Sequence, residues 1–132
     1  MNLKEYEMQE SAWMDIISPD GTQVVAQFEI AGRDSKVLKR RQAQLAKKRQ
    51  AKRKISAAEE EADTIETLAV CTLNWRDVDE DGKPKEEDGY IINGKEKVEC
   101  TSENARAIYE EHQWIAEQVV EFLAERANFL AK

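Results

Sequence analysis

The chain has 132 residues, of which 41% are hydrophobic and 36% charged, so it can form one domain with a modest core but not a large enzyme with a deep pocket. It contains no apolar run of about 18 residues and no basic start followed by an apolar stretch, so we expect no membrane span and no signal peptide. The net charge of −7 hides an asymmetry: half of the 20 basic residues lie in residues 36–54, which contain no acidic residue. This basic segment can pair with the chain's own acidic surface as readily as with a polyanion.

Residues 1–33 predict an N-terminal arm followed by a β-hairpin. Residues 12–17 can form one strand, and residues 24–30 alternate apolar and polar side chains as a half-buried strand does. Between them, Ser18-Pro19-Asp20-Gly21 is a turn sequence, because Pro presets φ and Gly tolerates a positive φ. We expect residues 1–11 to be frayed.

Residues 34–75 predict one long helix whose charge changes sign along its length. Asp34 and Ser35 are good N-cap residues, and no Gly or Pro follows before Gly82. The basic residues 36–54 are followed by acidic residues and then by an apolar end that reaches Trp75. We interpret this helix as a strut between the hairpin and a C-terminal unit.

Residues 76–132 predict a small helical unit with an acidic loop and a short second hairpin in residues 77–100. Asn93-Gly94 suits a type I′ turn. Thr101-Ser102 should cap a helix over residues 103–111, and apolar spacing predicts a last helix over about residues 114–129. The expected fold class is therefore α+β, mainly α. The aromatic residues expected to form the C-terminal core or to face a partner are Trp75, Trp114, Phe122 and Phe129.

The basic segment is the main candidate for a binding surface. Ten cations in residues 36–54 could hold phosphates with strong salt dependence, but no aromatic side chain is interleaved for base stacking. A protein partner is thus the favoured interpretation, and nucleic acid is the alternative. The candidate partner-binding residues are Lys39, Arg40, Lys47, Lys48, Arg49, Lys52 and Arg53.

The acidic loop has the spacing of a calcium-binding loop at Asp77, Asp79, Asp81 and Asp88. However, Pro84 occupies the position that an EF-hand gives to an apolar residue, no helix is predicted after the loop, and there is only one such loop. We interpret it as an acidic, solvated turn, with calcium binding as a weaker alternative and no cofactor expected.

No catalytic arrangement is evident in the sequence. His112 is the only histidine, and no nucleophile motif accompanies it. Cys71 and Cys100 occur in unrelated contexts and are expected to be reduced thiols. We therefore expect a protein that is not an enzyme.

Several short segments resemble the tail assembly chaperones of long-tailed phages and prophages. In the first half these are residues 17–21 and Gly32-Arg33-Asp34-Ser35 opening a basic helix. In the second half they are an acidic helix running into residues 68–71 and Asn74-Trp75, then residues 100–106 and 126–130. The resemblance spans most of residues 15–130, although residues 83–98 form a longer insertion than the family pattern has.

The resemblance implies a non-enzymatic role in phage tail morphogenesis, in the cytoplasm of a bacterial host. Such chaperones coat the long, aggregation-prone tape-measure protein and deliver tail-tube subunits, so these two proteins are the implied partners. Self-association of the basic helix with an acidic surface is a further option, and no membrane partner is expected. The alternatives that rest on the residues themselves are a nucleic-acid-associated phage protein using residues 36–54 and a calcium-binding protein using residues 77–88.

Overall fold

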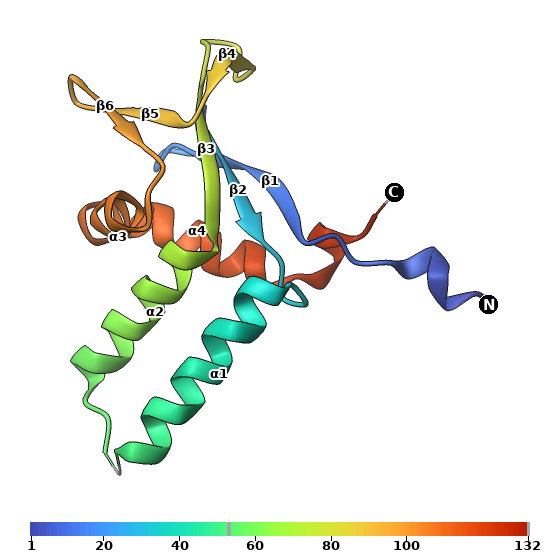
Figure 1. The fold of residues 1–132 in the computed structure, drawn as a ribbon. Coiled ribbons are helices and arrows are strands. Elements are labelled where there is room, and N and C mark those ends of the chain that lie inside the picture. Colours follow the sequence, from blue (N-terminus) through green and yellow to red (C-terminus); the bar gives the residue numbers. More distant parts are fainter. Residues whose placement is uncertain (53, 132) are drawn as a thin grey trace.

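The computed structural model describes residues 1–52 and 54–131, and these form an α+β fold with an N-terminal hairpin, as predicted (Figure 1). Strands β1 to β4 make an antiparallel sheet in the order β1-β2-β3-β4, and β5 pairs with β6 in a second, two-stranded sheet. In chain order the elements are η1 (Leu3–Tyr6), β1 (Ser11–Ile17), β2 (Val24–Ala31), α1 (Lys36–Ala51), α2 (Ala57–Cys71), β3 (Thr72–Val78), β4 (Pro84–Asp88), β5 (Tyr90–Asn93), β6 (Glu96–Glu99), α3 (Ser102–Glu111), α4 (Gln113–Ala124) and η2 (Arg126–Phe129).

The predicted continuous helix over residues 34–75 is wrong: this segment contains two helices and a strand. Helices α1 and α2 lie side by side and antiparallel, forming a helical hairpin that projects away from the sheets (Figure 1). Ser56 caps α2, because its hydroxyl oxygen accepts a hydrogen bond from the backbone N–H of Glu59 at 3.1 Å. Ser56-Ala57-Ala58-Glu59 has the pattern of a capping box, which starts a new helix without any Gly or Pro.

Trp75 lies in strand β3 rather than at the end of a helix. The helical hairpin is inserted between β2 and β3, which pair antiparallel with Phe28 opposite Trp75. The strand begins at Thr72 directly after α2, and its buried positions include Thr72, Trp75 and Val78. Aromatic and β-branched residues favour such a half-buried strand, and pairing with β2 supplies the hydrogen bonds that a helix would otherwise provide.

An aromatic cluster links the sheet to the C-terminal helices. The Phe28 ring lies 5.3 Å from the Trp75 ring and 6.2 Å from the Tyr109 ring of α3, measured between centroids. The buried Tyr109 hydroxyl is 2.6 Å from Oγ1 of Thr72, and the indole N–H of Trp75 donates to the carbonyl of Val98 in β6 at 2.9 Å. The cluster therefore joins both sheets and α3 in one core, to which α4 adds Ile115, Ala116 and Val119.

The opposite face of the four-stranded sheet is polar. The guanidinium of Arg76 lies 3.9 Å from the centroid of the Trp13 ring, and its Nε donates to Gln27 at 2.8 Å. Gln27 in turn donates to Asp15 at 2.8 Å. The alternation predicted for residues 24–30 is thereby confirmed, with Phe28 in the core and Gln27 on the polar face.

The C-terminal unit follows the prediction in outline. Thr101 caps α3, and β5 and β6 form the predicted short hairpin. Its turn differs in type: Gly94 has a φ of 66° while no non-Gly residue described has a positive φ, so the turn has the type II′ rather than the type I′ pattern. The last helix ends at Ala124, five residues earlier than predicted, and the short helix η2 follows.

Only part of the N-terminal arm is unpaired. The backbone N–H of Gln9 donates to the carbonyl of Phe129 at 2.7 Å, and that of Ala131 donates to Glu7 at 2.9 Å. A Cβ at Gly32 would lie 3.0 Å from the buried Phe129 ring, so glycine permits this close approach. The two ends of the chain are thus held together beside β1.

We predict that Trp75→Ala lowers the free energy of unfolding by about 3–5 kcal/mol, because it leaves a large cavity and an unpaired Val98 carbonyl. Trp13→Ala, on the polar face, should cost about 1 kcal/mol, the size of a lost cation–π contact. Urea unfolding followed by circular dichroism measures both. Equal losses in the two variants would contradict this account of the core.

Candidate functional site

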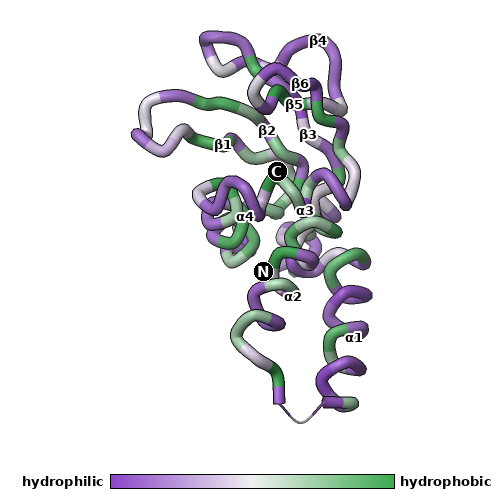
Figure 2. Tube along the Cα trace, turned by 90° about the vertical axis from the view of Figure 1, so that its left-hand side faces the viewer, coloured by the Kyte–Doolittle hydropathy of each residue, from purple (hydrophilic) through white to green (hydrophobic). Residues whose placement is uncertain are grey.

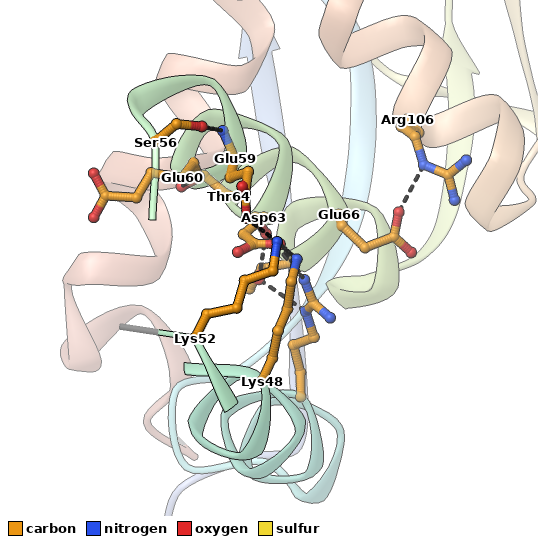
Figure 3. A network of polar contacts seen from close by, with 11 residues as sticks. Lys48, Lys52, Ser56, Glu59, Glu60, Asp63, Thr64, Glu66 and Arg106 are labelled. Carbon is orange, nitrogen blue, oxygen red and sulfur yellow. Dashed lines mark hydrogen bonds and ion pairs between the residues drawn. The ribbon is translucent and has the colours of Figure 1, made fainter. Parts of the chain in front are cut away.

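The basic segment faces the chain's own acidic helix. Nζ of Lys48 is 2.8 Å from Oδ1 of Asp63, and Nζ of Lys52 is 3.1 Å from Oε2 of Glu59, so both side chains reach from α1 to α2 (Figure 3). Arg41 donates to the hydroxyl of Thr67 at 3.0 Å and to the backbone carbonyl of Asp63 at 3.2 Å. Three cations of the basic segment, Arg41, Lys48 and Lys52, are therefore engaged with α2 inside the helical hairpin.

Asp63 is the most buried acidic group of this contact, with 7% of its surface exposed. The hydrogen bond from Lys48 holds the pKa of the Asp63 carboxyl below its usual value of 3.8, and the charges of Lys48 and Arg41 act in the same direction against desolvation. Its second oxygen, Oδ2, is buried and has no hydrogen-bond partner among the described residues. One buried acceptor thus remains unsatisfied beside α1.

The predicted partner-binding residues divide into two groups. Lys48 and Lys52 are engaged with α2, as described above. Within residues 1–52 and 54–131, Lys39, Arg40 and Lys47 are exposed and make no ion pair, and the same holds for Arg49; Arg53 lies outside the described residues.

An apolar hollow lies in the corner between α4 and the helical hairpin. Figure 2 shows α4 to one side of the hairpin, next to α2. The hollow has two parts, of about 440 Å³ and 360 Å³, and Thr64, Leu68 and Val120 line both. We call this hollow the corner groove. Its other apolar lining residues are Leu38, Leu45, Ile65, Ala116, Leu123 and Ala124.

The two parts of the corner groove differ in charge. The larger part, beside α3 and the start of α4, is edged by four carboxylates that make no ion pair with any described residue: Glu61, Glu110, Glu117 and Glu121. The smaller part, beside α1, carries both signs, from Arg33, Arg49 and Asp63. Val120, between them, is 44% exposed. The groove therefore offers an apolar floor with one acidic end.

A smaller apolar hollow of about 290 Å³ lies between β2, β5 and the start of α4. Half-buried Trp114 lines it together with His112, whose ring is 5.9 Å from the indole, edge to face. Of the other predicted aromatic residues, Trp75 and Phe129 are fully buried, and Phe122 packs on Phe129 at 5.2 Å. Trp114 is thus the one of the four that is placed at a surface hollow.

The four aspartates with calcium-loop spacing do not form a cluster. Asp77 pairs with Lys85 at 2.9 Å, Asp79 accepts from the backbone of Asp81 and Lys83, and Asp88 lies 3.9 Å from Arg76. In the described part of the chain, no group of three or more His, Cys, Asp or Glu side chains is placed to hold a metal ion. The segment is the turn of the β3–β4 hairpin.

Both cysteines are free thiols. Burial raises the pKa of Cys71 to about 11 and that of Cys100 to about 11. Neither is therefore a thiolate at neutral pH.

Sequence reasoning missed the corner groove, because it exists only after the chain reverses between α1 and α2. The capping-box sequence Ser56–Glu59 was the available signal for that reversal. Once α2 is a separate helix, Leu68 and Ile65 line a hollow together with residues of α4, instead of continuing one long helix.

Comparisons of the chain with protein-family models, curated proteins and solved structures find no match. Among the helices of the described residues, none is long and apolar enough to cross a membrane.

We predict that acid loosens α1 from α2. Because the folded pKa of Asp63 lies below the unfolded one, its ion pair contributes fully above about pH 4 and is lost as the pH falls through the folded pKa. Hydrogen exchange followed by mass spectrometry, corrected for intrinsic rates, should show α1 losing protection before β2 and β3. Asp63→Asn should show this loss already at pH 6, whereas Glu61→Gln, on the exposed side of α2, should not. Equal protection of α1 in wild type and Asp63→Asn at pH 6 would contradict the assignment.

Proposed function

We propose that this protein is a non-enzymatic tail assembly chaperone of a long-tailed phage or prophage, which acts in the host cytoplasm on the tape-measure and tail-tube proteins. The observation that carries the proposal is the corner groove: apolar side chains from α1, α2 and α4 line an open hollow. A chaperone needs such a surface, because an aggregation-prone client must cover its apolar segments until it assembles. The short sequence segments that resemble tail assembly chaperones supply the family.

The size of the groove suits reversible binding. Burying two or three large apolar side chains of a client contributes about 1.5–3 kcal/mol each, and the lost freedom of the two molecules offsets much of this. The gross gain is therefore about 3–9 kcal/mol, and the net affinity of this contact alone is weaker than micromolar, which corresponds to about −8 kcal/mol. A chaperone that leaves before the tail is complete requires an interaction of this strength.

The arrangement of charges on α1 and around the groove favours a protein partner over nucleic acid. Lys48, Lys52 and Arg41 are directed toward α2, which leaves fewer cations on one face for phosphates. Acidic residues also line the neighbouring groove. A double helix approaching α1 would therefore meet charges of both signs.

Co-expression with the tape-measure protein of the same phage tests the proposal. We expect the soluble fraction of the tape-measure protein to rise several-fold with this chain, and an affinity tag on the chain to retain it. The matched control is the Val120→Lys variant, in the floor of the corner groove, which should lose the effect while keeping the fold. A tape-measure protein that is equally insoluble with and without the wild-type chain would contradict the proposal.

A binding assay with a 20-base-pair DNA duplex tests the nucleic-acid alternative. If four exposed α1 cations contacted phosphates, log K would fall with log salt at a slope of about −3.6. We expect no saturable binding at 150 mM salt with protein at tens of micromolar. Tight binding with such a slope, abolished by Lys39→Glu/Lys47→Glu, would favour the alternative instead.

A further inference from the structure

We infer that the corner groove is a docking site for an amphipathic helix that carries lysine or arginine beside its apolar face. The inference rests on the proposed function for the identity of the client, the tape-measure protein. It assigns to this chain the surface that holds the client and the charge of the segment that binds there.

The arrangement of the groove fits a helix. Helix α4 and the helical hairpin supply the two walls, and Leu68 and Val120 line both parts of the hollow, so the two parts adjoin each other. A third helix laid into the corner can place apolar side chains spaced three and four residues apart into both parts. It would then cover Val120, which is 44% exposed.

The negative charge of the groove favours a client segment that carries basic side chains. Glu117 and Glu121 are four residues apart on α4, so they lie on one face of the helix and repel each other. Glu61 on α2 faces the same part of the hollow, and none of the three makes an ion pair with a described residue. Lysine or arginine side chains flanking the client's apolar face would relieve this repulsion, whereas carboxylates would add to it.

A second observation is a buried hydrogen-bond acceptor at the other end of the groove. Asp63 lines the smaller part of the groove and is more than nine-tenths buried, yet its Oδ2 has no partner among the described residues. A buried carboxylate oxygen without a donor is unfavourable. This oxygen is closed to solvent, so a donor of the client would reach it only after the Asp63 side chain turns, while Arg33 and Arg49 on the same rim keep this end close to neutral.

Helix α1 of a second copy fits this role less well than a separate client. The apolar residues of α1 that line the groove, Leu38 and Leu45, already face the inside of the helical hairpin. The outer face of α1 then presents cations without an apolar stripe beside them. A second copy would supply charge but little apolar surface.

Two labelled peptides of about 18 residues, five helical turns, test the inference on the full chain. Both carry the same leucine and alanine face, flanked by lysine in one and by glutamate in the other. By fluorescence anisotropy we expect the lysine peptide to bind at least about tenfold more tightly, with the difference shrinking at high salt. Amide shifts in NMR spectra should map its site to residues 61–68 and 116–124.

Matched variants test the groove itself. The double variant Glu117→Lys/Glu121→Lys should remove or invert the preference for the lysine peptide. The control, Glu86→Lys/Glu96→Lys, changes the net charge by the same amount on β4 and β6 and should leave that preference unchanged. Val120→Lys should weaken binding at least about tenfold. Val25→Lys should not weaken binding, because Val25, which is 38% exposed, lines the separate hollow around Trp114. All four variants must melt within a few degrees of wild type.

The outcomes separate the inference from the proposed function. Equal binding of the two peptides, or shifts confined to the outer face of α1 or to the hollow around Trp114, would overturn the docking site. Self-association of the chain that Val120→Lys abolishes would also overturn it, because a second copy would then occupy the groove.

If the peptides behave as expected but the tape-measure protein stays insoluble in co-expression, the docking site stands and the proposed client is wrong. If Val120→Lys solubilises the tape-measure protein as well as wild type does, the client binds elsewhere.

Discussion

The packing of Phe28 against Trp75 is the contact on which the rest of the structure depends. The two residues lie opposite each other on β2 and β3, yet 40 residues, 32–71, separate these strands, and most of them form the helical hairpin. Closing so long a connection costs chain entropy, which only a large buried contact can offset. Trp75 makes that contact and also donates to Val98, while Phe28 meets Tyr109. The same cluster therefore positions the helical hairpin, the second sheet and α3.

The helical hairpin depends on electrostatics to a degree that the globular part does not. Away from the sheets, α1 and α2 share few buried apolar residues, and Lys48–Asp63 and Lys52–Glu59 bridge the gap between them. Lys48 and Lys52 are about half exposed, and ion pairs with an exposed partner are individually weak, so the outer end of the hairpin is held less firmly than its base at Leu38 and Leu68. Under the proposed function, such a gradient in local stability would let the surface adapt to a client.

The corner groove follows from where α4 crosses the hairpin. Had α4 packed flat along α2, Val120 and Ile65 would be core residues, and no apolar surface would remain for a partner. Instead α4 contacts both the sheet and α2, so one of its faces completes the core through Val119 while the next residue, Val120, lines the corner groove. The acidic side chains on α4 then set the charge of the groove.

The sequence by itself determined the local elements: the β1–β2 hairpin from its Pro-Asp-Gly turn and alternation, the caps at Ser35 and Thr101, and the basic and acidic character of residues 36–66. These depend on neighbours a few residues apart, which a sequence displays. It did not determine that residues 34–75 reverse direction, since helix propensity continues across the break and the capping box at Ser56 competes with it only weakly. The reversal, the strand at Trp75 and the corner groove were decided by tertiary structure. Pairing of β3 with β2 and of Lys48 with Asp63 joins residues far apart in sequence, and their free energy appears only when the whole chain is folded.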